Sequence, residues 1–231
     1  MRCVLFDLDG TLADSAPDLA AALNRVRADE GLPSVDAGTL RGHSSSGARG
    51  MLQAGMQIAS DHPRYLELRD AFLAHYARVL ADSTQLFDGV AAMLDALDAR
   101  GIRWGVVTNK AERYTGPVTA ALGLASRAAV IVSGDTTPHP KPHPAPLLHA
   151  AEKLAIDPAL CAYVGDDLRD IEAGRAAAMA TLVARWGYMG IDADPDRWPA
   201  DGWLDAPGDL VTWLEAGAMR RKANARQVPQ F

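Results

Sequence analysis

The spacing of hydrophobic residues divides the chain into segments that predict different elements. A short apolar run over residues 3–6, ended by acidic residues and a glycine, predicts a buried strand that leads into a loop. Ser15 and Asp18 then have the spacing of a helix N-cap and its third helical residue. Apolar residues from Leu19 onward recur at helical spacing until Gly31, so we expect a helix there.

The segment from residue 14 to residue 86 has helical spacing and no convincing strand pattern. Further helices are expected over residues 47–56 and along an apolar stripe from Tyr65 to Val79. We therefore expect a small all-helical insert on the first loop of the fold.

From residue 87 onward, apolar runs typical of strands alternate with amphipathic stretches typical of helices. Four such runs predict strands over residues 102–107, 129–133, 160–164 and 181–184. This alternation predicts an α/β fold, with right-handed crossovers and a Rossmann-like parallel sheet covered on both faces. The expected divisions are a core of residues 1–13 and 87–219, an insert of residues 14–86, and a solvated basic tail of residues 220–231.

Composition and charge narrow the function classes. The 231 residues are 48% hydrophobic and 23% charged, which is typical of a globular protein. A formal net charge of -6 argues against general nucleic-acid binding, and no apolar stretch reaches the length of a membrane span. Cys3 and Cys161 lie in strand-like segments, so we expect both to be buried and free in a cytoplasmic protein.

Polar residues follow the predicted strands. Because ligands bind outside the carboxyl ends of parallel strands, these side chains are expected to share one crevice. They are Asp7 and Asp9, Thr108 and Asn109, Lys141, and Asp166 with Asp167 and Asp170. Asp7 and Asp9 are two residues apart and would face the same way, which suits a divalent cation such as Mg²⁺. Taken alone, this pair is equally typical of an acidic turn.

Four segments, in this order, resemble the motifs of the haloacid dehalogenase superfamily of phosphotransferases: Asp7-Leu8-Asp9-Gly10-Thr11, Thr108, Lys141-Pro142, and Gly165-Asp166-Asp167 with Asp170. The resemblance covers nearly the whole chain and ends before the basic tail. A helical insert between the first two motifs resembles the C1 cap of the phosphoglycolate phosphatase branch.

This resemblance implies hydrolysis of phosphomonoesters through an aspartyl-phosphate. Asp7 would be the nucleophile, and Asp9 would protonate the leaving group and later take a proton from water. Thr108 and Lys141 would bind the phosphoryl group. Mg²⁺ would be held by the Asp7 carboxylate, the Asp9 backbone carbonyl and Asp166.

Several neighbouring residues have two open interpretations. Asp167 and Asp170 either orient the metal ligands or stabilise the start of a helix. Asn109 either contacts phosphate or caps the next helix. Lys110 is expected to be a solvated residue at a helix start or a charge at the rim of the site. His139 and His143, on either side of Lys141, are expected to pack in the loop or lie exposed.

The insert is expected to determine specificity. Arg49 and Gly47, with Ser45 and Ser46, form a polar patch suited to an anionic or hydroxylated substrate, although Arg49 is equally typical of a surface arginine and His43 is a weaker candidate. The finer resemblance, carried by the segments 45–49, 104–110, 164–171 and 185–188, is to the N-acetylmuramic acid 6-phosphate phosphatases of peptidoglycan recycling. The alternative substrate is 2-phosphoglycolate.

Other functions leave different signatures. A hydrolytic dehalogenase has no use for a carboxylate at Asp9, and a phosphosugar mutase needs an insert that excludes water. A non-catalytic binding protein with this fold should lack one of Asp7, Asp9, Lys141 or Asp166, and all four are present. We expect a small phosphorylated sugar or 2-phosphoglycolate as substrate, and a monomer or homodimer with no nucleic-acid or membrane partner.

Overall fold

A six-stranded parallel sheet forms the centre of the protein, in a computed structural model that describes residues 1–191 and 193–226, with only the backbone for residues 218–226. The strand order is β5-β4-β1-β6-β7-β8. The strands are β1 (Cys3–Phe6), β4 (Arg103–Val107), β5 (Ile131–Val132), β6 (Cys161–Gly165), β7 (Ala180–Ala184) and β8 (Gly202–Leu204). The predicted α/β fold with a parallel sheet is confirmed.

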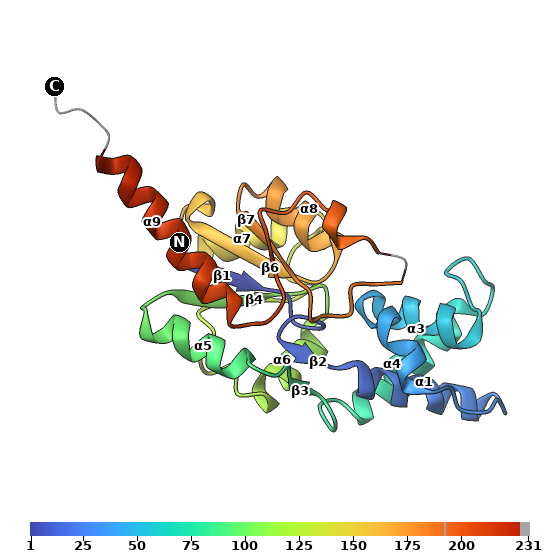
Figure 1. Cartoon of the computed structure of the whole chain (residues 1–231). Helices are drawn as coiled ribbons and strands as arrows, with labels where there is room; N and C mark the ends of the chain where they lie inside the picture. The colour runs from blue at the N-terminus through green and yellow to red at the C-terminus, as the bar shows by residue number, and fades with distance from the viewer. Residues whose placement is uncertain (192, 227–231) are drawn as a thin grey trace.

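Alternating side chains of β1 build two separate cores on the faces of the sheet. Val4 and Phe6 pack in the core under α5 (Val90–Ala99), α6 (Glu112–Ala121) and α9 (Asp209–Arg226). Cys3 and Leu5 pack in the core under α7 (Ala145–Leu154) and α8 (Leu168–Ala176). Figure 1 shows α5 and α6 on one side of the sheet and α7 and α8 on the other. Strand β1 is buried on both faces, so its end is a rigid support for a site.

The insert forms a third apolar cluster of its own. Its elements are α1 (Ala16–Asp29), α2 (Ala37–Leu40), the 3₁₀ helix η1 (Arg41–Ser46), α3 (Gly47–Met56) and α4 (Tyr65–Arg78). Leu23, Met51 and Phe72 are buried in this cluster, and Tyr114 of α6 joins it from the core. Figure 1 shows α1, α3 and α4 grouped beside the sheet, on the side away from α9.

Two very short strands connect the core with the insert, in a segment where the sequence predicts only helices. Strand β2 (Ala13–Asp14) pairs with β3 (Gln85–Leu86) in an antiparallel ladder. Two residues are too few to give an alternating pattern, so no sequence signal marks them.

The C-terminal segment also differs from prediction. Strand β8 extends the sheet beyond the last predicted strand, and helix α9 continues through Arg226, inside the predicted tail. No proline or glycine interrupts residues 219–226, which explains the longer helix. Residues 227–231 of that tail lie outside the described part.

Two smaller predictions have clear outcomes. Helix α1 begins where predicted, but Ser15 makes no capping hydrogen bond, and Asp18 instead accepts hydrogen bonds from Ser83 and Thr84. Cys3 and Cys161 are buried and free, as predicted. Within residues 1–191 and 193–226, none of the helices combines the length and the apolarity that crossing a bilayer would take.

Candidate active site

The carboxyl ends of adjacent strands bring the candidate residues to one edge of the sheet. Asp7 follows β1, Thr108 follows β4 and Asp166 follows β6, and β1 pairs with both of the other strands. Lys141, from the loop after β5, lines the same cavity as Asp7 and Thr108. The structure therefore brings together residues that lie up to 159 positions apart in the sequence.

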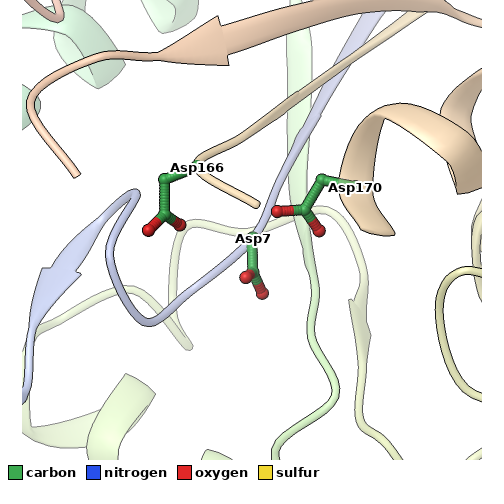
Figure 2. Close-up of side chains that lie close together, drawn as sticks. All are labelled: Asp7, Asp166 and Asp170. Carbon is green, nitrogen blue, oxygen red and sulfur yellow. The ribbon is translucent and has the colours of Figure 1, made fainter. Parts of the chain in front are cut away.

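Three carboxylates form an acidic cluster at this edge. One oxygen each of Asp7, Asp166 and Asp170 lie within 4.8 Å of one another (Figure 2). Burial and the carboxylates of Asp7 and Asp170 raise the pKa of Asp166 well above its usual range. Burial also raises the pKa of Asp170 to about 6, although Lys141 opposes the shift. Three hard oxygen donors that repel one another are a set suited to a divalent cation.

Asp166 is held in place from several directions. The Thr11 hydroxyl donates a hydrogen bond to its Oδ1 at 3.0 Å, and the Tyr188 backbone N–H donates to its Oδ2 at 2.9 Å. Glycines make this close packing possible: a Cβ on Gly10, whose φ is +87°, would lie 2.2 Å from Oδ2, and a Cβ on Gly187 would lie 2.3 Å from the Asp166 Cβ. These contacts fix the carboxylate before any ligand binds.

Lys141 neutralises part of the acidic cluster. Its ammonium lies 2.8 Å from Asp170 Oδ1 and 2.9 Å from Asp7 Oδ1, and its side chain is only 2% exposed. The ammonium also donates to the Tyr163 hydroxyl at 2.7 Å and to the Val107 carbonyl at 3.1 Å. The contact with Asp7 Oδ1 is an ion pair without hydrogen-bond alignment, so this oxygen still lacks a hydrogen-bond partner.

Of the two interpretations of Asn109, capping of the next helix is wrong, whereas contact with phosphate stays a prediction for a residue that lines the cavity. Its side-chain amide donates to the Lys141 backbone carbonyl and accepts from the Lys141 N–H, both at 2.9 Å. The N-cap of α6 is Ala111, so Asn109 does not cap that helix. Asn109 instead fixes the loop that carries Lys141. Thr108 lies beside the cavity, and its hydroxyl accepts a hydrogen bond from the Lys110 N–H.

The two acidic residues at the start of α8 have different surroundings. Asp167 caps the helix and forms an ion pair with Arg169 at 2.8 Å. Burial alone would raise the pKa of Asp167, but the hydrogen bonds and charge of Arg169 outweigh it, so the pKa is lowered. Asp170 accepts from the Asp167 N–H and also belongs to the acidic cluster. The position of Asp167 fits the interpretation that it stabilises the start of the helix. The position of Asp170 fits that interpretation and also a role beside the metal ligands.

The Asp9 carboxylate lies outside the acidic cluster and has partners of its own, one of which the sequence does not predict. Its carboxylate accepts a hydrogen bond from the Ser15 hydroxyl at 2.5 Å, and both of its oxygens lie 2.9 Å from Lys110 Nζ. The Lys110 side chain is only 8% exposed. The expectation of a solvated or rim lysine is therefore wrong. Asp9 itself supplies the charge that makes burial of this lysine possible.

A cavity of about 320 Å³ lies between the core and the insert. The core contributes charged residues that include Asp7, Asp9, Lys141 and Asp170, whereas Asp166 is not among the lining residues. The insert contributes a largely apolar wall that includes Leu19, Phe72 and Tyr76. In the described part of the chain, three buried side-chain polar atoms lack a hydrogen-bond partner: Asp7 Oδ1, Ser44 Oγ and Tyr76 Oη. All three residues line this cavity, which identifies it as a site for a polar ligand.

The polar patch predicted in the insert lies only partly in the cavity. Ser45, Ser46 and Gly47 line it, but Arg49 is exposed and is not among the lining residues, nor is His43. His139 and His143 are exposed and their rings lie 4.7 Å apart. Arg169 of the core does reach this part of the insert, because it donates to the Ser45 carbonyl.

Sequence reasoning misses Tyr76, Tyr163 and Tyr188 as residues of the site. Tyr163 and Tyr188 lie in apolar or aromatic segments, where a tyrosine cannot be distinguished from a core residue by pattern. Tyr76 falls on the apolar stripe of α4, so its helical spacing also indicates a core position.

Comparisons with known proteins agree with this geometry. Residues 1–178 match the family of haloacid dehalogenase-like hydrolases. The chain is 42% identical over 215 residues to the N-acetylmuramic acid 6-phosphate phosphatase of Pseudomonas aeruginosa, covering 93% of this chain and 95% of that one. It is 44% identical over 209 residues to the phosphoglycolate phosphatase of Xanthomonas campestris pv. campestris, covering 90% and 94%.

A similar architecture is present in a solved structure. The crystal structure of a predicted phosphoglycolate phosphatase from Haemophilus somnus superposes with a TM-score of 0.81 at 26% identity. The superposition covers 93% of this chain and 98% of that chain.

Proposed function

The chain belongs to the haloacid dehalogenase-like hydrolases, and from this premise we propose that it is a Mg²⁺-dependent phosphatase of small phosphomonoesters. The observation that carries the proposal is the cavity in which Asp7, Asp9, Lys141 and Thr108 meet. Asp7 Oδ1 is buried there, its one close partner in the described part of the chain being the Lys141 ammonium at 2.9 Å, as suits a nucleophile that must stay ionised.

The acidic cluster fits the metal that this function needs. Asp7, Asp166 and the Asp9 backbone carbonyl would hold Mg²⁺, and the position of Asp170 makes it a further candidate ligand. Burial is the main cause of the raised pKa values of Asp166 and Asp170, with repulsion from Asp7 adding to it, and a bound cation would oppose both effects. When bound, Mg²⁺ would neutralise charge on the phosphoryl oxygens.

The side chains divide the reaction between them. An Asp7 oxygen bonds to phosphorus while the bond to the leaving oxygen breaks, and Asp9 gives that oxygen a proton. Water then bonds to phosphorus as the Asp7–phosphorus bond breaks, and Asp9 takes the proton from water. Lys141 and the Thr108 hydroxyl stabilise the phosphoryl oxygens throughout. All four residues line the cavity.

The insert would act as the cap that recognises the leaving group, with residues 14–86 as its proposed boundaries. The hydroxyl oxygens of Ser44 and Tyr76 accept or donate no geometrically aligned hydrogen bond among the residues that the structure describes. Burial raises the pKa of Tyr76 to about 12, so its hydroxyl stays protonated and able to donate a hydrogen bond. Two such hydroxyls above an apolar wall suit a ring that carries hydroxyl or amide groups.

We propose N-acetylmuramic acid 6-phosphate as the substrate, with 2-phosphoglycolate as the alternative. The relatives do not decide between them, because identities of 42% and 44% are nearly equal. The cavity of about 320 Å³ favours the sugar, since the two-carbon acid would leave Ser44 and Tyr76 without partners. A cytoplasmic location is part of the proposal and is consistent with the free, buried cysteines.

The test compares kcat/KM of the purified, Mg²⁺-loaded protein for the two esters. We expect kcat/KM for N-acetylmuramic acid 6-phosphate to exceed that for 2-phosphoglycolate by at least about 30-fold, because two buried hydroxyls left unpaired cost about 1–3 kcal/mol each. A preference for 2-phosphoglycolate would reverse the substrate assignment. Absence of phosphate release from either ester and from 4-nitrophenyl phosphate would reject the phosphatase itself.

A further inference from the structure

Lys110 is a buried cation whose one carboxylate partner in the described chain is Asp9. Its Nζ lies 2.9 Å from each oxygen of that carboxylate, and the side chains are 8% and 17% exposed. Two equal contacts fix both the position and the rotation of a carboxylate, which a single contact does not. Ser15 adds a third contact, to Oδ1.

The backbone around Lys110 is itself anchored. The Lys110 carbonyl accepts hydrogen bonds from the Gly134 N–H at 2.8 Å and the Thr115 hydroxyl at 2.9 Å. Its N–H donates to the Thr108 hydroxyl at 3.2 Å. The lysine therefore extends from a rigid loop between β4 and α6.

Lys110 also contacts the insert. Its Nζ lies 4.9 Å from the centre of the Tyr76 ring, at cation–π distance, and Tyr76 belongs to α4. The Tyr76 side chain is buried and packs in the apolar cluster of the insert. The lysine thus has the catalytic carboxylate on one side and the wall of the insert on the other.

An ion pair that only stabilised the fold would have no reason to occupy this place. Taking an ammonium out of water is costly, and in proteins the replacement of a buried ion pair by an apolar pair of similar volume is often neutral or stabilising. Lys110 and Asp9 both line the cavity. The orientation of Asp9 is the property that this arrangement provides.

We propose that Lys110 is a positioning residue that orients the Asp9 carboxylate toward the leaving oxygen, and that Tyr76 couples the position of the insert to this contact. The inference rests on the proposed role of Asp9 in the phosphatase reaction. When the insert is seated over the cavity, the Tyr76 ring confines the lysine, and the lysine confines Asp9. Proton transfer is then efficient only with the substrate enclosed.

The test uses aryl phosphates of nearly equal size whose leaving groups differ in acidity. Phenyl phosphate needs a proton on its leaving oxygen far more than 4-nitrophenyl phosphate does. For Lys110→Met, kcat/KM should fall about 10- to 100-fold more for phenyl phosphate than for 4-nitrophenyl phosphate, a part of the 10²- to 10⁴-fold that a general acid supplies. Equal losses for the two esters, or no loss, would overturn the proposal.

Asp9→Asn and Lys153→Met complete the comparison. Asp9→Asn should show the same dependence on the leaving group, only larger; if it does not, the proposed role of Asp9 has failed and not only that of Lys110. Lys153, exposed in the last turn of α7, is a matched lysine whose replacement should leave both esters unchanged. A loss in Lys153→Met equal to that in Lys110→Met would also reject the proposal.

Presteady-state kinetics provide a second measurement. Asp9 acts as base on the phospho-enzyme formed from either ester, so Lys110→Met should release a burst of 4-nitrophenol before a slow steady state. A general loss of folding would lower the burst and the steady rate together. A Lys110→Met protein without a burst would contradict the positioning role.

The coupling to the insert is tested at Tyr76, with two variants that leave Lys110 itself unmutated. Tyr76→Leu removes the ring and should reproduce a weaker form of the dependence on the leaving group. Tyr76→Phe keeps the ring, so any loss in kcat/KM should be the same for both aryl esters, without the dependence on the leaving group. Identical behaviour of Tyr76→Leu and Tyr76→Phe would remove Tyr76 from the proposal.

Discussion

The two walls of the cavity are built on different principles. On the core wall, Asp9, Asp170 and Lys141 all have charged partners inside the protein, at 2.8–2.9 Å. On the insert wall, within the described part of the chain, the hydroxyl oxygens of Ser44 and Tyr76 have no hydrogen-bond partner and lie among apolar side chains. The difference indicates that the groups of the reaction are fixed in advance, whereas the recognition groups are completed only by the ligand.

Few contacts join these walls. The Ser45 hydroxyl donates to Asp166 at 3.3 Å, and Arg169 donates to the Ser45 carbonyl at 2.8 Å. The Tyr76 ring lies against Lys110. Contacts of this kind would form when the insert encloses a ligand and break when it opens. They would thereby link enclosure of the ligand to the residues of the core wall.

The largest effect should come from the core wall. Asp7→Asn removes the negative charge of the nucleophile without changing its shape, and we expect kcat to fall at least about 10⁴-fold. Phosphate release from 4-nitrophenyl phosphate measures the change, and thermal unfolding checks that the fold survives. Activity near the wild-type level would mean that the core wall does not provide the nucleophile.

Lys141→Met should damage stability as well as activity. It leaves the carboxylates of Asp7 and Asp170 buried without their cation, which costs about 3–5 kcal/mol. Urea unfolding in the presence of EDTA measures the free energy of unfolding, with Lys153→Met as the exposed control. A change below about 1 kcal/mol would show that the core wall is not prearranged by charge pairing.

Binding of Mg²⁺ should depend on pH through the acidic cluster. The folded-state pKa of Asp170 is raised to about 6, against about 3.9 in an unfolded chain, and that of Asp166 is raised as well. The folded protein therefore binds these protons more tightly, so without metal its stability falls as the pH rises from about 4 through 6.

Mg²⁺ competes with the same protons, so it should stabilise the protein more at about pH 8 than at about pH 5. At 100 times its dissociation constant a ligand contributes about 2.7 kcal/mol. Differential scanning calorimetry with Mg²⁺ and with EDTA gives the shift in Tm at each pH. A shift in Tm that is equal at the two pH values, or larger at pH 5, would show that the carboxylates of Asp166 and Asp170 do not take part in metal binding.

The smallest effects should come from the insert wall. Ser44→Ala removes one hydrogen bond to the substrate, so kcat/KM for N-acetylmuramic acid 6-phosphate should fall about 2- to 10-fold, while that for 4-nitrophenyl phosphate stays unchanged. Arg49→Ala is the control on the same insert, because Arg49 is exposed outside the cavity lining. If Arg49→Ala has the larger effect, the recognition wall is assigned to the wrong residues.

The core wall is the part of the site that the sequence predicts best. Asp7, Thr108, Lys141 and Asp166 each follow a strand, and parallel strands necessarily end at the same edge. The acidic motif and the position of each strand are local signals, so a single sequence contains them.

The insert wall and the partners of each charge are harder to predict. Lys110 becomes buried only because Asp9, 101 residues earlier, lies beside it, and no local pattern encodes such a pair. The hydrogen bond between the Asn109 side chain and the backbone of Lys141 likewise joins two separate loops, so no local pattern encodes it. Tyr76 carries the apolar spacing of a core residue, and strands of two residues, such as β2 and β3, are too short to show a period.

The most direct test of the central claim, that Asp7 carries the phosphoryl group during turnover, is mass spectrometry of acid-quenched enzyme after borohydride reduction. An acyl phosphate is reduced to an alcohol, which marks the carboxylate that held the phosphoryl group. During steady turnover of 4-nitrophenyl phosphate, we predict reduction at Asp7 alone, and none without substrate. Reduction at Asp9, or steady turnover with Asp7 never marked, would contradict the account.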